Sequence, residues 1–435
     1  MTKKARWATY LAAAFGGATL VILPAMPHVS AAAMAQGAKG NTEVAANTKS
    51  TAHAKKSAVP KPPPVGMQVP QLPPRIPFTA ADEAAASIPG MPDARFWADS
   101  ETDFNNALPK TPGPWLILSS GGSDGAFGAG FVNGLTAAGN RADYAVVTGV
   151  STGALIAPFA FAGPKYDDAL RDAFTKVSAA DIFEIRLTGE SLLDSWPLKD
   201  LIAKEITPAL LADIAVEHNK GRRLFVVTTD LDAERSVVWN LGAIAAHGGD
   251  DAVKLFRTVL LASTAIPGGF PPVLVDVEAN GKKFQELHVD GGVGGQFFVA
   301  PAKLMASAGD YRLPATQLYI VIDTGLEPEF EVVDRSLGTI LARSVGAAVK
   351  VDTRLMIDRA YVVAKRSNVG FNIATIPSSF NTPSHGAFDT AYMTALYQAG
   401  FDLAKSARPF SIEPPPYPGR PVIESSDGEK TGANR

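Results

Sequence analysis

Apolar and polar positions divide this chain of 435 residues into a regular central part and two irregular ends. In the centre, short and continuously apolar runs alternate with longer runs in which apolar residues recur at helical spacing. Runs of the first kind predict buried strands, and runs of the second kind predict helices. The predicted strands are 115–119, 144–150, 224–229, 236–240 and 318–323. The predicted helices are 125–138, 154–162, 167–177, 198–206, 250–261, 339–363 and 388–407.

Continuously apolar strands are typical of a sheet that is covered on both faces. Because these strands alternate with helices, the pattern predicts an α/β sandwich of three layers with a mostly parallel central sheet. In such sheets, sites lie at the C-terminal ends of the strands. The segments that directly follow strands 115–119 and 144–150 are therefore the first places to look for chemistry.

The first 35 residues have the pattern of a signal peptide. Three basic residues precede an uncharged apolar stretch, 7–26, and Ala33 and Ala35 form an A-x-A-like cleavage site before Gln36. The apolar stretch is also almost long enough to span a bilayer, so an uncleaved membrane anchor is the alternative. The pattern predicts export across the inner membrane to the periplasm, the outer membrane or the outside of the cell.

Both flanks of the regular part are polar and rich in proline. Residues 36–95 consist largely of Ala, Lys, Thr and Pro, and residues 411–435 have a similar character. Such segments cannot bury a core. The sequence therefore predicts a disordered tether over 36–95, one catalytic domain over 96–410 and a disordered tail over 411–435.

Composition excludes several classes of function. A net charge of −3 gives no general attraction to nucleic acid. The absence of cysteine excludes disulfides, thiolate nucleophiles, cysteine metal sites and a lipid-modified cysteine at the N-terminus. The acidic residues show no EF-hand or clustered ligand spacing, so no metal and no other cofactor is expected.

Two glycine-rich segments connect predicted strands to predicted helices. Residues 149–153 read Gly-Val-Ser-Thr-Gly, and small residues around a serine at a strand-to-helix turn are typical of a nucleophile elbow. Residues 121–125 read Gly-Gly-Ser-Asp-Gly, which formally contains the same motif around Ser123. A run of glycines, however, better suits backbone N–H groups that converge on an anion. Ser151 is therefore the predicted nucleophile.

A serine nucleophile needs a general base, and histidine is the usual one. His385 could complete the chain order Ser151, Asp290, His385 that is found in α/β-hydrolases. The simpler interpretation of His385 is a solvated histidine in a loop. A histidine-dependent esterase therefore stays open as an alternative.

These motifs resemble the patatin-like acyl hydrolases, which use a Ser–Asp dyad without histidine. The family's glycine-rich loop, G-x-S-x-G and distant Asp-Gly-Gly occur here in that order at 120–125, 149–153 and 290–292, and residues 262–272 are similar as well. The resemblance covers about 113–305. It implies a patatin-like fold, Ser151 as nucleophile and Asp290 as base. It also implies an oxyanion hole at Gly121, Gly122 and Gly125, in which Gly125 contributes the helix dipole.

Two residues depart from the family pattern. Ser120 replaces the first of three glycines, and Asp124 replaces the usual Arg or Lys. A carboxylate about 6 Å from a developing oxyanion would cost roughly 3 kcal/mol at an effective dielectric constant of 20. We therefore expect Asp124 to point away from the site, for example as a cap on the helix that begins at Gly125. The alternative is a weak or inactive patatin-like domain that binds lipid or acts as a scaffold.

The substrate follows from the resemblance more than from the residues. The family's usual esters are phospholipids and lysophospholipids, which implies an enzyme of the phospholipase A or lysophospholipase type. Residues 182–211 are rich in large apolar side chains. They could form the wall of an acyl-chain site or a mobile cap, and ordinary core packing explains them equally well.

Overall fold

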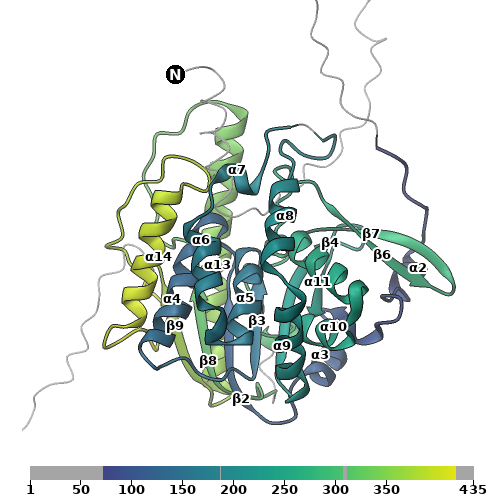
Figure 1. The fold of residues 1–435 in the computed structure, drawn as a ribbon. Helices are drawn as coiled ribbons and strands as arrows, with labels where there is room; N and C mark the ends of the chain where they lie inside the picture. The colour runs from purple at the N-terminus through teal and green to yellow at the C-terminus, as the bar shows by residue number, and fades with distance from the viewer. Residues whose placement is uncertain (1–71, 187, 307–310, 418–435) are drawn as a thin grey trace, which may run out of the picture. The chain divides into compact units, whose positions relative to one another are not determined.

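A nine-stranded sheet forms the centre of the part that the computed structural model describes, which is residues 72–186, 188–306 and 311–417 (Figure 1). The predicted signal peptide lies outside these residues. Along the sheet the strand order is β1-β5-β4-β3-β2-β8-β9, and β7 pairs with both β4 and β6. The strands are β1 Arg95–Trp97, β2 Gly113–Leu118, β3 Val146–Val150, β4 Arg223–Asp230, β5 Arg235–Asn240, β6 Val273–Ala279, β7 Lys282–Asp290, β8 Ala315–Ile322 and β9 Gly370–Thr375.

The centre of this sheet is parallel, as the apolar strands predict. Strands β4, β3, β2, β8 and β9 run parallel to their neighbours in that order. Antiparallel pairing occurs where β5 and β7 join β4, where β1 joins β5, and between β6 and β7. The prediction of a mostly parallel α/β sheet is confirmed.

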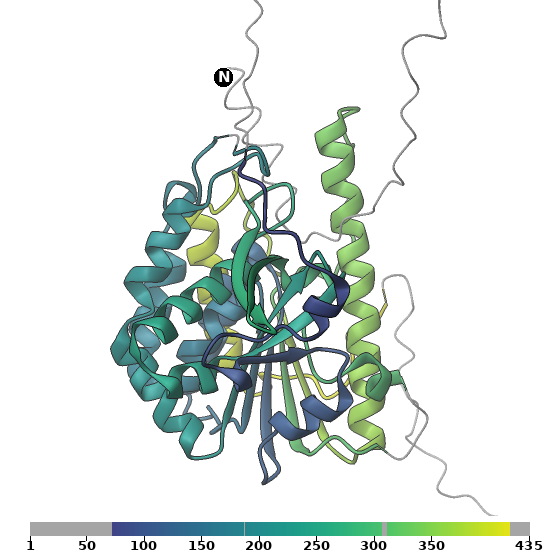
Figure 2. The same ribbon diagram turned by 90° about the vertical axis from the view of Figure 1, so that its right-hand side faces the viewer.

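Helices cover both faces of the sheet, so that it lies between two layers (Figure 2). Neighbouring strand residues such as Leu116 and Ile117 point into separate cores because side chains alternate along a strand. The first core is completed by α4, α5, α6, α8, α9, α10, α11 and α14, and the second by α3, α12 and α13. The helices are α2 Ala80–Ala84, α3 Glu101–Ala107, α4 Gly125–Ala137, α5 Thr152–Ala162, α6 Asp167–Thr175, α7 Ala179–Ile182, α8 Trp196–Glu205, α9 Pro208–Asn219, α10 Leu241–His247, α11 Gly249–Ser263, α12 Ala302–Ala306, α13 Leu337–Arg366 and α14 Thr390–Ala404.

Helix α4, which follows the first glycine-rich segment, is held by unusually close packing against α14. A Cβ atom on Gly130 would lie 1.9 Å from the backbone oxygen of Tyr397. A Cβ atom on Gly134 would lie 2.4 Å from the oxygen of Phe401. Only glycine permits this approach, so the small residues of α4 fix the position of the loop that precedes it.

The hairpin formed by β6 and β7 is absent from the sequence prediction. Its turn is Asn280-Gly281, and both residues have a positive φ, 52° and 78°. Asn-Gly is the strongest short-range signal for a two-residue hairpin turn. Strand β7 ends at Asp290, which pairs with Thr228 of β4. The hairpin therefore brings Asp290 to the end of the central strands.

Packed structure begins earlier than the predicted boundary at residue 96. Arg75 donates to Asp232 at 2.9 Å, and the ring of Phe78 stacks on Phe284 with 4.4 Å between centroids. Arg95 forms an ion pair with the buried Glu286. These contacts come from single side chains in a proline-rich segment, so composition does not reveal them.

At the other end, packing continues past the predicted boundary at residue 410. The backbone of Ser411 pairs with Ile373 of β9, with N···O distances of 2.8 Å in both directions. The hydroxyl of Tyr417 donates to Asp358 at 2.6 Å. The ordered part of the chain therefore extends at least to Tyr417.

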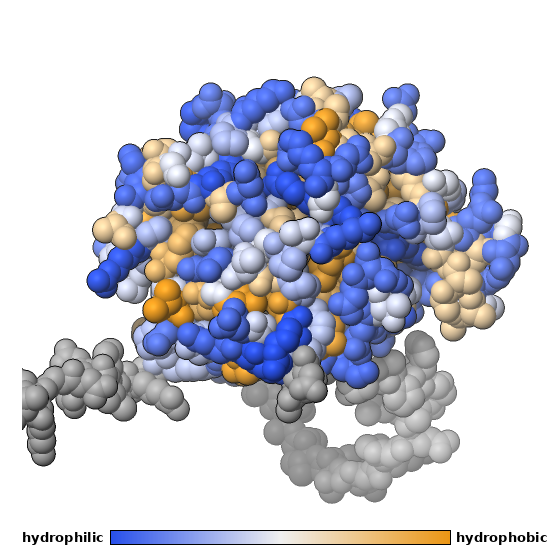
Figure 3. Space-filling model, turned by 90° about the horizontal axis from the view of Figure 1, so that it is seen from below, coloured by the Kyte–Doolittle hydropathy of each residue, from blue (hydrophilic) through white to orange (hydrophobic). Residues whose placement is uncertain are grey.

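The surface carries polar and apolar residues side by side. Seen from below, hydrophilic side chains form most of the outline and apolar ones appear in patches between them (Figure 3). Among the described residues, no helix combines the length and the hydrophobicity needed to cross a membrane.

Candidate active site

Ser151 lies on a sharp turn between β3 and α5. Its φ of 54° and ψ of −122° are unusual for a residue with a side chain. A Cβ atom on Gly149 would lie 2.3 Å from the oxygen of Gly153, and one on Gly153 would lie 2.6 Å from the oxygen of Leu118. The two glycines of the motif thus allow strand and helix to approach closely, and this packing holds Ser151 in its strained conformation.

The hydroxyl of Ser151 donates a hydrogen bond to Oδ2 of Asp290 at 2.6 Å. The other carboxylate oxygen, Oδ1, accepts the N–H of Gly292 at 2.7 Å. Ser151 and Asp290 are each 5% exposed. Burial raises the pKa of Asp290 to about 7, although the hydrogen bonds from Ser151 and Gly292 oppose this shift. Near neutral pH the carboxyl group of Asp290 therefore populates both its protonated and its deprotonated form.

Residues 262–267 hold the two halves of this pair in place. The N–H of Ser151 donates to Oγ of Ser263 at 3.1 Å, and Ser263 in turn donates to the oxygen of Val227 at 2.7 Å. The N–H of Asp290 donates to the oxygen of Ala265 at 2.9 Å. This segment, recognised in the sequence only by resemblance, therefore connects the nucleophile turn, β4 and the Asp290 loop.

The loop at 121–125 presents backbone N–H groups beside Ser151. Gly122 has a φ of 57° and lines the same pocket as Ser151. In the described part of the chain, the N–H groups of Gly121 and Gly122 donate to no other group. The N–H of Gly125 is already bonded to the oxygens of Gly122 and Ser123. Gly121 and Gly122 therefore remain the candidate donors to an oxyanion, and Gly125 begins helix α4 behind them.

Ser120, the first departure from the family pattern, is buried and hydrogen-bonded to the buried Gln296. Its hydroxyl donates to Oε1 of Gln296, and its N–H donates to the backbone oxygen of Gln296 at 2.8 Å. The side-chain amide of Gln296 donates to the oxygen of Gly292 at 2.9 Å. Ser120 and Gln296 thus connect the glycine-rich loop to the loop that carries Asp290.

Asp124, the second departure, does not line the pocket that contains Ser151. Its carboxylate accepts the hydroxyl of Tyr392 at 2.9 Å and lies in a separate groove. The expectation that it caps α4 is wrong, because its side chain makes no capping hydrogen bond. The buried Asp323 instead accepts the N–H of Gly128 in the first turn of α4 at 2.7 Å. Burial raises the pKa of Asp124 to about 6 and that of Asp323 well above its usual value.

An almost wholly apolar pocket of about 770 Å³ adjoins Ser151. Its walls come from α5, α6, α7, α8, α14 and the segment that follows α11. The large apolar residues that line it are Leu155, Phe159, Phe174, Val177, Ile182, Leu198, Leu201, Ile202, Ile206, Ile266, Phe270, Phe388 and Met393. From the apolar region expected at 182–211, five residues line this pocket: Ile182, Leu198, Leu201, Ile202 and Ile206. Ile185, Leu192 and Trp196 are instead half or more exposed.

The structure does not bring His385 to the Ser151–Asp290 pair. His385 lies in an exposed loop, where its backbone N–H donates to Asp389 at 3.0 Å. It does not line the pocket that contains Ser151. The chain order of a Ser-Asp-His triad is present, but its geometry is not.

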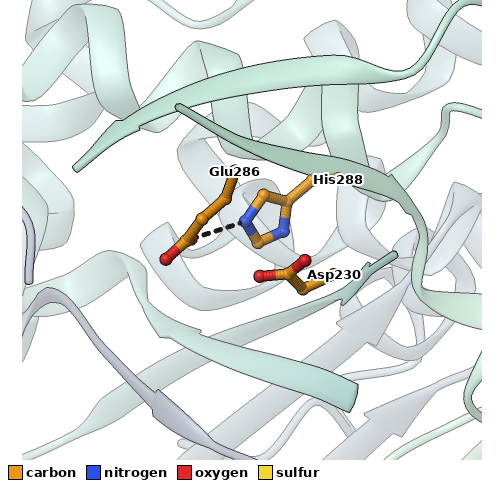
Figure 4. A group of neighbouring side chains, drawn as sticks. All are labelled: Asp230, Glu286 and His288. Carbon is orange, nitrogen blue, oxygen red and sulfur yellow. Dashed lines mark hydrogen bonds and ion pairs between the residues drawn. The ribbon is translucent and has the colours of Figure 1, made fainter. Parts of the chain in front are cut away.

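A buried cluster of metal-ligand types lies apart from this pair. Figure 4 shows Glu286 and His288 of β7 next to Asp230 at the end of β4. Both oxygens of Glu286 are bonded to Arg95, and the ring nitrogens of His288 lie 3.1 Å from Glu286 and 2.9 Å from Thr228. Because protein groups already engage the ligand atoms of Glu286 and His288, these two residues fit a hydrogen-bonded ion-pair network that ties Arg95 to β7.

The fold and the site together define an α/β protein with a buried serine on a tight strand-to-helix turn. Residues 116–303 match the family model described as patatin-like phospholipase. Residues 116–303 are therefore similar to a patatin-like phospholipase domain, and that family supports a lipid acyl hydrolase activity in general.

Among solved structures, the protein is similar to VipD from Legionella pneumophila, with 12% sequence identity and a TM-score of 0.33. That match covers 68% of this chain and 67% of VipD. A search of curated proteins gave no match.

The hydrogen bond from Ser120 to Gln296 predicts a measurable loss of stability when Ser120 is replaced by alanine. In Ser120→Ala, Oε1 of Gln296 loses its donor while it stays buried, so the free energy of unfolding should fall by about 1–3 kcal/mol. Urea denaturation of this variant, beside Ser406→Ala at an exposed position, measures the difference. Equal stability of the two variants would show that the Ser120–Gln296 hydrogen bond does not hold the loop.

Proposed function

We propose that this protein is an exported lipid acyl hydrolase of the phospholipase A or lysophospholipase type, a serine carboxylic-ester hydrolase with Ser151 as nucleophile and Asp290 as base. The observation that carries the proposal is the 2.6 Å hydrogen bond from Ser151 Oγ to Asp290 Oδ2 beside an apolar pocket. A serine bonded to a buried carboxylate with a raised pKa has a base within reach of its proton.

In the proposed mechanism, Asp290 takes the proton of Ser151 as its Oγ attacks the ester carbonyl. The N–H groups of Gly121 and Gly122 donate to the oxyanion of the tetrahedral intermediate, and the N-terminus of α4 adds a favourable dipole. Protonated Asp290 then returns the proton to the departing alcohol, which leaves an acyl ester on Ser151. Water attacks this ester with Asp290 again acting as base, and the fatty acid is released.

The apolar pocket supports an acyl chain as the part of the substrate that is bound. Its almost wholly apolar lining suits a flexible hydrocarbon chain with the ester at Ser151. Burial of each methylene group would contribute about 0.8 kcal/mol. The preference for phospholipid or lysophospholipid rests on the family alone.

Two observations favour an active enzyme over an inactive scaffold. Ser120 is engaged with Gln296, so its hydroxyl is directed to a protein partner. The Asp124 side chain lies in a different depression from the one that contains Ser151. The two departures from the family pattern therefore do not obstruct the proposed oxyanion hole.

The dyad predicts the effects of three substitutions on the hydrolysis of p-nitrophenyl esters and lysophosphatidylcholine. Ser151→Ala and Asp290→Asn should each lower kcat by about 10³-fold or more, because each removes a group that takes part in every step. His385→Ala should retain wild-type activity, and EDTA should have no effect. A fluorophosphonate probe should label the wild type but not Ser151→Ala. Substantial activity of Ser151→Ala, or its loss in His385→Ala, would contradict the dyad.

The raised pKa of Asp290 predicts the pH dependence of kcat/KM. Only the deprotonated carboxylate can accept the Ser151 proton, so kcat/KM should fall below about pH 7 and reach a plateau above it. The fall should approach tenfold per pH unit in the acidic limb. Initial rates with a p-nitrophenyl ester between pH 5 and 9 measure this profile. A rate that is constant from pH 5.5 to 8 would exclude Asp290 as the base.

Export predicts that the mature protein begins at Gln36. When the full chain is expressed in a bacterium with two membranes, N-terminal sequencing of the periplasmic fraction should yield this new terminus. A bulky residue in the variant Ala35→Tyr should block cleavage and leave the longer precursor. If the wild type keeps residues 1–35 and stays in the inner membrane, the N-terminus is an anchor.

A further inference from the structure

A second depression, distinct from the apolar pocket, also borders the glycine-rich loop. Gly122 lines the pocket that contains Ser151, whereas the next two residues, Ser123 and Asp124, line a groove of about 2200 Å³. The other walls of the groove are residues 324–334, one face of α13, and Tyr392 of α14. The glycine-rich loop thus borders both an apolar pocket and a larger groove whose walls carry charged as well as apolar side chains.

The basic side chains of the groove are paired with carboxylates. Lys350 lies 3.1 Å from Glu329, Arg354 lies 3.2 Å from Glu327, and Arg343 lies 3.6 Å from Glu331. Among the described residues, Lys350, Arg354 and Arg343 are the only basic ones that line the groove.

Asp124 is different. Within 72–186, 188–306 and 311–417 it forms no ion pair, and its hydrogen bonds come from neutral hydroxyl groups, those of Tyr392 at 2.9 Å and of Ser123. Lys350 is the ammonium group that acts on Asp124 electrostatically, and Glu329, which already binds Lys350, acts on it too. Two carboxylates thus share one cation at the end of the groove beside the loop. This end carries an excess negative charge.

We propose that this groove receives the headgroup of the lipid, and that Asp124 and Glu329 select headgroups that carry an ammonium group over anionic ones. The inference rests on the proposed function, because it requires an ester at Ser151. With the acyl chain in the apolar pocket, the alcohol part must leave Ser151 in another direction. The groove next to the same loop offers it charged and polar partners.

The charge balance of the groove gives the direction of this selectivity. The ammonium group of a lipid headgroup could form an ion pair with Asp124, which has none in the described part of the chain. Because Asp124 is partly buried, solvent and salt would screen this pair less than a pair at the surface. A headgroup that carries only a phosphate adds negative charge next to two carboxylates. Two lipids that share acyl chain and phosphate, and differ only in ethanolamine or glycerol, isolate this difference.

The test compares kcat/KM for decanoyl lysophosphatidylethanolamine and decanoyl lysophosphatidylglycerol below their micellar concentrations. Assays at pH 8 keep Asp124 ionised, since its pKa is about 6. The wild type should prefer the ethanolamine lipid about tenfold, in line with one ion pair in a medium of intermediate dielectric constant. Asp124→Asn should bring the ratio close to one. Asp168→Asn, at an exposed site on α6, should leave the ratio unchanged.

A second variant keeps the inference testable if Asp124→Asn does not fold. Glu329→Gln changes an exposed side chain and releases Lys350, so it should also shift the ratio towards the glycerol lipid. Equal rates on both lipids in the wild type, or a ratio that neither variant changes, would overturn the inference. If p-nitrophenyl esters are hydrolysed while the lysolipids are not, the headgroup site is overturned and the hydrolase survives. Inactivity on every ester would instead refute the proposed function.

Discussion

The hydrogen bond between Ser151 and Asp290 is the interaction on which the rest of the site depends. It joins residues 139 positions apart, one on a strained turn after β3 and the other at the end of β7. The strain at Ser151 persists because Gly149 and Gly153 let strand and helix approach closely. Asp290 stays buried because β7 pairs with β4 and because Ala265 accepts its N–H. A short polar contact is thus held by packing on both sides.

The sequence predicted the centre of this structure well. Continuously apolar strands and amphipathic helices predicted a parallel sheet between two layers of helices. This was possible because the spacing of apolar residues in a strand or helix can be read from a short stretch of sequence. Ser151 could be identified from its glycines, because only a tight strand-to-helix turn needs small residues at that spacing. The sequence placed Asp290 through resemblance alone, since an Asp-Gly-Gly triplet contains no local sign of its partner.

What the sequence missed depends on contacts between distant residues. The dipeptide Asn280-Gly281 is a sequence signal for the turn of the β6–β7 hairpin, but the predicted strands did not include this hairpin. The Ser120–Gln296 bond spans 176 positions, and no local pattern predicts it. Asp124 was expected to cap α4, but the buried Asp323 takes that place from the end of β8. The N–H of Gly128 in the first turn of α4 is therefore bonded to a carboxylate that is 195 positions away in the sequence.

The ion pair between Arg95 and Glu286 has a consequence for the order in which the chain folds. Its partners are 191 positions apart, and the hairpin that carries Glu286 also ends in Asp290. During synthesis from the N-terminus, residues 75–97 emerge first but have no surface to dock on until most of the domain has followed. The same holds for Ser151, which precedes its base by more than a hundred residues. Contacts of such long range form slowly. Among the described residues, the segment that is synthesised first is therefore among the last to find its place, and the Ser151–Asp290 hydrogen bond forms only once most of the described domain has been made.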